Sequence, residues 1–147
     1  MHAVKGFAYE RGMKTAYKAL SIQLAAENDT VSQIEQVFRK FGFYTTREYP
    51  IYKIKDGSGR AGRIDLVARK GKFRVAVEYD HHEVIKWKSF QKIVQIKPDI
   101  AIGIAGKGDL EPNIERATKY IKALSSPLYV ISLKEKRYRI FNKQNTD

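Results

Sequence analysis

Residues 62–80, GRIDLVARKGKFRVAVEYD, constrain the fold more than any other stretch of this chain. Two apolar runs flank the KGK sequence at 70–72, which is typical of a tight turn, so the stretch predicts a β-hairpin. Asp65 and Glu78 interrupt these runs where a buried strand favours valine or isoleucine, and Asp80 follows two residues later. The hairpin therefore carries three carboxylates that need a physical explanation.

Helices are expected in segments where apolar residues recur at helical spacing, namely residues 8–26, 30–41, 82–96 and 112–124. The second helix has Thr30 or Asp29 as its expected N-cap and Gly42 as its stop. The third must end before Pro98. Trp87 falls among the apolar positions of that third helix, so we assign it to the core.

Strands are expected at 45–55, in both arms of the hairpin, at 99–105 and in a second hairpin over 127–141. The run DIAIGIA at 99–105 is continuously apolar, which is typical of a buried parallel strand. The resulting order is α-α-β-β-β-α-β-α-β-β. It predicts a single α/β domain over residues 1–147, with a mixed central sheet and helices on both faces.

The charge of the chain points to a polyanionic partner. There are 28 Lys and Arg residues against 16 Asp and Glu, a formal net charge of +12. Such an excess favours nucleic acid through phosphate contacts and counterion release, and the alternative is a surface charged only for solubility. The candidate phosphate contacts are Arg60, Arg63, Lys86, Lys88 and Lys107.

Several classes of site are excluded by composition. The sequence has no cysteine, so disulfides, thiolate metal sites and cysteine nucleophiles are absent, and three histidines are too few for a His-rich zinc site. A catalytic metal would therefore need oxygen ligands. No stretch approaches the roughly 20 apolar residues of a membrane span, and the first residues do not resemble a signal peptide. We expect an intracellular, cytoplasmic protein with no membrane partner.

The carboxylates of the hairpin favour a metal site. Glu78 and Asp80 share one face of their strand, because alternate residues of a strand point the same way. Pairing about Gly71 sets Asp65 opposite Val77, so a small register offset or a bulge is needed to bring Asp65 and Glu78 onto one face. Clustered carboxylates repel one another, and a hard divalent cation such as Mg²⁺ neutralises them.

A second interpretation of the hairpin carboxylates needs no metal. Asp65 and Glu78 are also suited to pairing with Arg63 and Arg74, or to protecting an edge strand from aggregation. The two histidines at 81 and 82 follow the strand, and we interpret them as loop residues, with a phosphate contact or a proton carrier as the alternative.

The order of acidic residues resembles the PD-(D/E)xK nuclease superfamily. Glu35 on a helix precedes Asp65 and Glu78 on adjacent strands in D-x12-E spacing, and a helix and a strand follow. The resemblance covers residues 31–105, the restriction-endonuclease-like αβββαβ core, and is nearest to the Holliday-junction-resolvase-like and restriction-endonuclease-like branches. It implies an endonuclease that hydrolyses DNA with Mg²⁺ or Mn²⁺. Asp65, Glu78 and the Tyr79 carbonyl would bind metal, and Glu35 would hold a metal-bound water.

The sequence departs from the pattern of this superfamily at Asp80, which stands where the family carries a lysine two residues after the glutamate. In some members the lysine lies on the following helix. Lys92, near the border of the packed face, is our first candidate for that role, and Lys88, at the centre of the solvent face, is the second. Asp80 then has three interpretations: a third metal ligand, a partner of Lys92, or the N-cap of the following helix.

The leading hypothesis is a metal-dependent nuclease acting on DNA. A second is a non-catalytic nucleic-acid-binding protein that kept the fold and lost its chemistry with the motif lysine, and a third is a basic RNA-associated module. Proteins that cut two strands commonly act as dimers, so a homodimer stays an open alternative.

Overall fold

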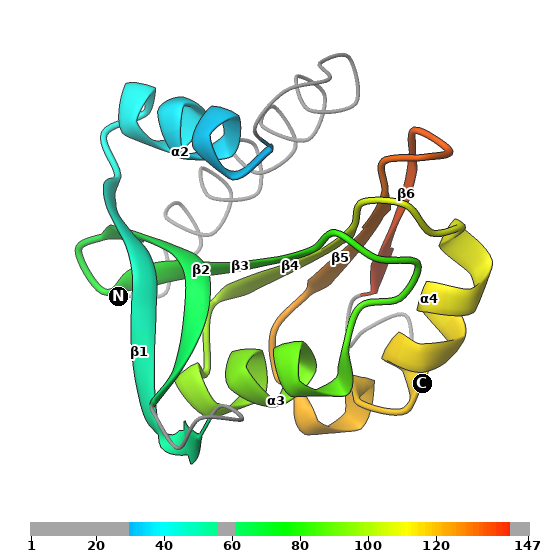
Figure 1. Cartoon of the computed structure of the whole chain (residues 1–147). Helices are drawn as coiled ribbons and strands as arrows, with labels where there is room; N and C mark the ends of the chain where they lie inside the picture. The colour runs from blue at the N-terminus through cyan, green and yellow to red at the C-terminus, as the bar shows by residue number, and fades with distance from the viewer. Residues whose placement is uncertain (1–29, 56–60, 142–147) are drawn as a thin grey trace.

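The computed structural model describes residues 30–55 and 61–141, which form a six-stranded mixed sheet covered by helices on both faces (Figure 1). The helix predicted over 8–26 and the predicted phosphate contact Arg60 lie outside the described residues. Within the described part, no helix is long and apolar enough to cross a membrane.

The strands follow one another across the sheet in chain order. They are β1 (Tyr44–Lys55), β2 (Ala61–Lys70), β3 (Phe73–Asp80), β4 (Ile100–Ala105), β5 (Leu128–Ser132) and β6 (Arg137–Phe141). The β1–β2 and β2–β3 pairs are antiparallel, β3–β4 and β4–β5 are parallel, and β5–β6 is antiparallel. The predicted mixed sheet is therefore confirmed, with a buried parallel strand at β4.

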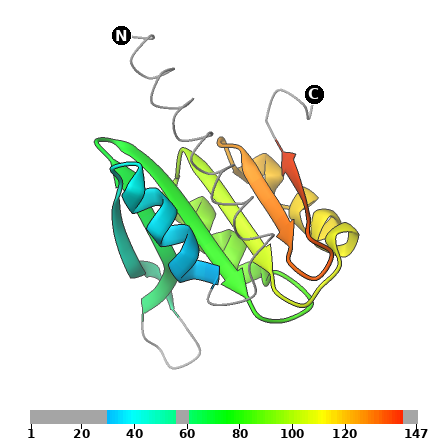
Figure 2. The same cartoon turned by 90° about the horizontal axis from the view of Figure 1, so that it is seen from above.

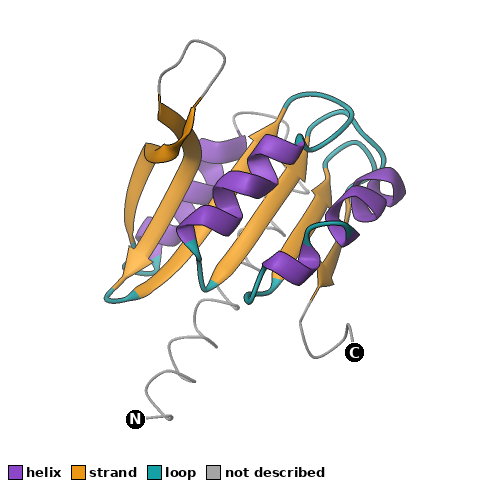
Figure 3. Ribbon diagram, turned by 90° about the horizontal axis from the view of Figure 1, so that it is seen from below, coloured by secondary structure: helices purple, strands orange, loops and turns teal. Residues whose placement is uncertain are grey.

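The helices form two layers. They are α2 (Thr30–Lys40), α3 (Trp87–Ile96) and α4 (Leu110–Thr118), with a short 3₁₀ turn at Ile121–Ala123. Helix α2 covers one face of the sheet (Figure 2), and α3 and α4 cover the other (Figure 3). Phe38 on α2 and Phe90 on α3 are fully buried in these two cores. Each aromatic side chain contributes about 1.5–3 kcal/mol by burial.

Helix α3 begins at Trp87, five residues later than the predicted segment 82–96, because residues 81–84 form a bend. Trp87 is the first residue of the helix, so no helical turn precedes it. The buried residues of α3 begin at Ser89. Its side chain is 46% exposed, so its assignment to the core was wrong. Ile85, two residues earlier, is fully buried in that core instead.

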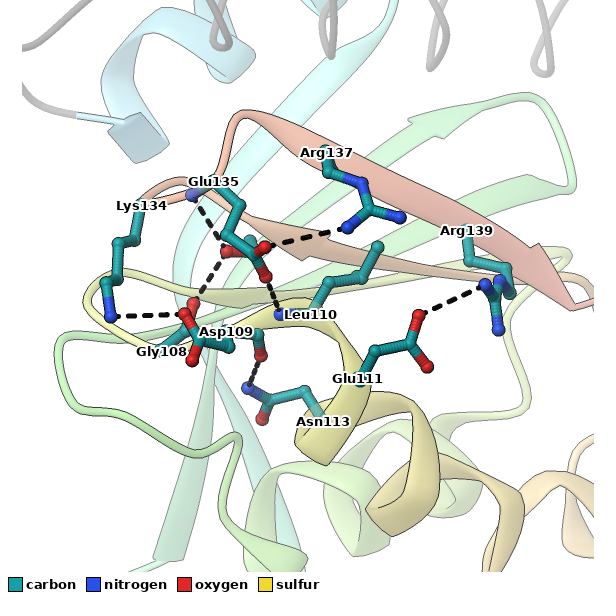
Figure 4. Close-up of polar contacts among 10 residues, drawn as sticks. Gly108, Asp109, Leu110, Glu111, Asn113, Lys134, Glu135, Arg137 and Arg139 are labelled. Atoms are coloured by element: carbon teal, nitrogen blue, oxygen red, sulfur yellow. Dashed lines mark hydrogen bonds and ion pairs between the residues drawn. The ribbon is translucent and has the colours of Figure 1, made fainter.

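Helix α4 begins before Pro112 rather than at it, and it ends at Thr118 rather than at Leu124. Proline is tolerated in a first turn, where its missing N–H has no intrahelical partner. The Glu135 carboxylate, from the turn between β5 and β6, accepts a hydrogen bond from the Leu110 N–H and holds the helix start (Figure 4). At the other end of α4 the Thr118 hydroxyl donates a hydrogen bond to the Glu115 carbonyl oxygen. This hydrogen bond competes with the backbone hydrogen bonds of the helix.

Candidate functional site

The β2–β3 hairpin brings the two predicted carboxylates together. Leu66 pairs with Val77, and the same register carried one residue further sets Asp65 opposite Glu78. A two-residue turn that starts at Gly71, with φ of 61°, fixes this register. The predicted pairing of Asp65 with Val77 was therefore wrong by one residue. No bulge is needed, because directly opposed residues of an antiparallel pair share one face.

The shared face of these carboxylates is the one covered by α3. Ala76, which alternates with Glu78 along β3, is buried in the core that contains Phe90 and Ile93 of α3. Val77 points the other way, into the core beneath α2. The hairpin thus directs Glu78, and Asp65 beside it, toward α3.

Lys92 reaches this pair from α3. Its Nζ lies 3.2 Å from Glu78 Oε1 and donates a 2.7 Å hydrogen bond to the Arg63 carbonyl oxygen. The Lys92 side chain is 17% exposed and that of Glu78 is 4% exposed, so the ion pair is largely shielded from water. Lys88, the second candidate, is exposed on the same helix, as predicted. The geometry favours Lys92 over Lys88.

Burial changes the protonation of both carboxyl groups. Burial raises the pKa of Glu78 to about 8, the charge of Asp65 adds to this effect, and Lys92 opposes it. Burial also raises the pKa of Asp65, against a 2.7 Å hydrogen bond from the Tyr79 N–H to Asp65 Oδ2. At neutral pH the Glu78 carboxyl therefore tends to carry a proton in the free protein.

Asp80 holds the start of α3. Its Oδ2 accepts hydrogen bonds of 3.0 Å from the Lys86 N–H and from the Ser89 hydroxyl. The N-cap residue of α3 is Lys86, so the interpretation of Asp80 as the N-cap was wrong, and Asp80 instead holds the first turn of the helix through these two contacts. Asp80 thereby fixes the helix that carries Lys92, and its charge also raises the pKa of Glu78.

Glu48 is an acidic neighbour that the sequence did not reveal. Arg47 pairs with Leu66 and Tyr49 with Ile64, so Glu48 on β1 stands across from Asp65. Its backbone has a φ of 53°, which is uncommon for a residue other than glycine. The charge of Glu48 raises the pKa of Asp65, so it acts on the site electrostatically. The β1–β2 register is the signal that locates it.

Glu35 is not brought to the carboxylate pair. It lies on α2, on the opposite side of the sheet from α3, and its carboxylate pairs with Arg39 at 3.5 Å and Arg47 at 3.6 Å. The resemblance gives Glu35 the role of holding a metal-bound water, and this role stays a prediction.

The predicted phosphate contacts that the structure describes are all at the surface. Arg63, Lys86, Lys88 and Lys107 are exposed. Lys107 is held by a hydrogen bond from its backbone N–H to the His82 carbonyl and lines a pocket of about 220 Å³ next to α4. His82 and its neighbour His81 are exposed in the bend after β3, so their prediction as loop residues is confirmed.

The donor set at the pair fits a hard divalent cation. Asp65 and Glu78 offer only oxygen, and Glu78 Oε1 is buried without accepting a hydrogen bond, although Lys92 Nζ is near. Among the described residues, no group of three or more His, Asp or Glu side chains is arranged to hold a metal. Mg²⁺ typically takes one or two carboxylates and completes its shell with water and substrate phosphate. Two carboxylates meet that requirement, whereas a closed zinc site needs more protein ligands.

Comparisons with known proteins give only distant likenesses. No protein-family model matches this sequence, and neither does any curated protein. A crystal structure of a protein of unknown function, AF1548, is similar with a TM-score of 0.43 and 11% identity, over 69% of this chain and 55% of that chain. The small subunit (R.BspD6I2) of the heterodimeric restriction endonuclease R.BspD6I is similar with a TM-score of 0.40 and 12% identity, over 80% and 72%. This chain spans about half the length of the AF1548 protein.

Proposed function

We propose that this protein is a metal-dependent nuclease that hydrolyses DNA phosphodiester bonds. The observation that carries the proposal is the meeting of Asp65 from β2, Glu78 from β3 and Lys92 from α3 on one face of the sheet. Two buried carboxyl groups beside a single lysine carry an excess of negative charge when both are ionised, and a divalent cation that replaces the proton of Glu78 neutralises it. The net charge of +12 suits a polyanionic substrate.

Each residue of this group has a distinct role in the proposal. Asp65 and Glu78 hold the cation, Mg²⁺ or Mn²⁺, and when bound it supplies Lewis acidity and lowers the pKa of water. Lys92 presents a positive charge to the phosphate, where negative charge grows as the bond to water forms. The Arg63 carbonyl keeps the Lys92 amine in place, so the charge is oriented before the substrate arrives.

Asp80 is a positioning residue in this proposal. It occupies the place of the family lysine, and its hydrogen bonds to Lys86 and Ser89 fix the helix from which Lys92 extends. A lysine supplied from α3 can then do the work of a lysine on β3. The change at Asp80 is thus compatible with retained activity.

A non-catalytic nucleic-acid-binding protein is the second candidate. The ion pair between Lys92 and Glu78 favours it, because this contact compensates part of the buried charge without any cation. Both candidates require a basic surface, so binding alone does not separate them.

Cleavage in the presence and absence of metal separates the two candidates. Supercoiled plasmid, branched DNA, single-stranded DNA and RNA are incubated with Mg²⁺ or Mn²⁺, and parallel samples contain EDTA. We expect metal-dependent cutting of DNA by the wild type and none by Asp65→Asn or Glu78→Gln. Cutting that survives both substitutions would show that the site is elsewhere. Binding without cutting of any substrate would favour the non-catalytic protein.

A further inference from the structure

Trp87 is exposed although its chemistry favours burial. Its side chain is 46% exposed at the first position of α3, and it is the single tryptophan of the chain. An indole is among the largest apolar groups in proteins, and leaving it in water forgoes a large favourable burial term. Tryptophan is enriched at interfaces, because its ring offers a large apolar face together with a polar N–H.

The residues next to Trp87 in the sequence are basic. Lys86 and Lys88, on either side of it in the sequence, are both exposed, and the bend before the helix carries exposed His81 and His82. Glu83 is the exposed acid of this segment. An exposed aromatic ring with an exposed lysine on each side in the sequence suits a nucleic acid strand in particular, because bases stack on the ring while phosphates pair with the lysines.

The position of Trp87 is fixed relative to the carboxylate pair. Asp80 Oδ2 bonds the Lys86 N–H before the tryptophan and the Ser89 hydroxyl after it, which anchors this first turn of α3 to the end of β3. Glu78 lies two residues earlier on β3, and Lys92 extends from the same helix as Trp87. The helix start that carries Trp87 is therefore tied to the end of the strand that carries Glu78.

We propose that Trp87 stacks on an unpaired base of a nucleic acid strand, while Lys86 and Lys88 bind the flanking phosphates. The ring face requires an unpaired base, because a paired base in a duplex is stacked on both sides and shows only its edges. This inference deepens the proposed function: it names substrates with single-stranded segments, such as frayed, gapped or branched DNA. Binding itself needs neither metal nor cleavage.

The fluorescence of the single tryptophan tests the stacking directly. The protein is titrated in EDTA with a single-stranded oligonucleotide, with the duplex of the same sequence, and with a duplex that contains unpaired bases. We expect quenching by the first and third ligands and little by the intact duplex. Quenching by none of them, or equal quenching by all three, would overturn the proposal.

Variants measured by anisotropy of a labelled oligonucleotide give a second readout. Since stacking contributes about 1–3 kcal/mol per base, Trp87→Ala should weaken single-strand binding about 5-fold to 150-fold and leave duplex binding within about 2-fold. Trp87→Phe should retain part of the affinity. Tyr44→Ala is the matched control, because this aromatic side chain on β1 is 78% exposed. Equal losses for Trp87→Ala and Tyr44→Ala would contradict a specific role.

The outcome is separable from that of the nuclease proposal. Quenching in the wild type and weaker single-strand binding by Trp87→Ala in the anisotropy assay, together with absence of cutting, would leave the stacking site standing and remove the nuclease. Cutting without quenching would do the reverse. If sedimentation shows that the wild type dimerises and Trp87→Ala does not, the ring is covered by a second copy and the stacking proposal is wrong.

Discussion

Two acidic regions of this molecule differ in how their charge is balanced. One is the carboxylate pair, Asp65 and Glu78, beneath α3. The other, here named the α4 cluster, surrounds the start of α4 and the turn between β5 and β6 (Figure 4). Its ion pairs join Lys134 to Asp109 at 3.1 Å, Arg139 to Glu111 at 3.3 Å, and Arg137 to Glu135 at 3.6 Å.

The two regions differ in burial and in the number of cations available to each carboxylate. In the α4 cluster each carboxylate of these ion pairs has its own cation and lies near solvent. The hydrogen bond and the charge of Asp109 raise the pKa of Lys134, so this lysine is charged. Beneath α3 two carboxylates share Lys92, and burial raises the pKa of both. Burial of two carboxyl groups beside one cation, rather than the number of carboxylates, separates a candidate site from a surface network.

The largest effect expected is the loss of metal binding at the carboxylate pair. Asp65→Asn and Glu78→Gln each remove one negative oxygen donor while keeping the size of the side chain, so cutting should fall to the level seen in EDTA. Calorimetry with Mn²⁺ should show affinity reduced at least about 10-fold in each variant.

Glu111→Gln is the control from the α4 cluster for these two variants. It removes a carboxylate of the same size that is paired with Arg139 at the surface. We expect its cutting and its Mn²⁺ affinity to match the wild type. A loss equal to that of Glu78→Gln would mean that the two regions do not differ in function.

The next effect concerns the lysine of each region. Lys92→Met removes the charge near the phosphate and should lower kcat about 100-fold, while Mn²⁺ binding is kept or strengthened because the competing ion pair with Glu78 is gone. Lys134→Met should leave kcat unchanged. A kcat that falls for Lys88→Met and not for Lys92→Met would transfer the role to Lys88.

A third difference between the regions is the pH dependence of stability without metal. The pKa of Glu78 is raised from its ordinary 4.5 to about 8, so between these values the folded protein holds a proton that the unfolded chain releases. Stability is greatest below that window and falls as pH rises through it, by up to about 1.4 kcal/mol per pH unit for this group. Urea unfolding is measured in EDTA between pH 5 and pH 8. The free energy of unfolding should fall less with rising pH in Glu78→Gln than in the wild type. Equal pH dependence of unfolding in the two proteins would contradict a raised pKa of Glu78.

Much of the fold could be predicted from the sequence. Alternating and continuous apolar runs predicted the strands, and the run at 99–105 predicted the parallel β4 correctly, because a strand buried on both faces has few polar residues. The start of α3 was missed. It depends on the Asp80 side chain, which holds the Lys86 N–H, and on a bend that apolar periodicity does not encode. The exposure of Trp87 follows from that start.

Three of the predicted site residues lie together in the structure, but their geometry was not predicted. Asp65 and Glu78 were named from their order and Lys92 from its place on the predicted helix. The meeting of the two carboxylates depends on a register that differs by one residue from the expected one. A two-residue turn and a longer turn look alike in the sequence KGK. Glu48 was missed because its place across from Asp65 depends on the pairing of β1 with β2. The sequence does not fix the register of that pair.

The smallest effect expected is structural and belongs to the α4 cluster. Glu135 accepts a hydrogen bond from the Leu110 N–H at the start of α4, so Glu135→Ala should cost about 1 kcal/mol in the free energy of unfolding. Glu111→Ala removes only the exposed pair with Arg139 and should cost about 0.5 kcal/mol or less. Urea unfolding ranks the two, and plasmid cutting should stay at the wild-type rate in both. If Glu135→Ala lowers cutting at a temperature where the protein remains folded, the α4 cluster affects catalysis and is more than a structural network.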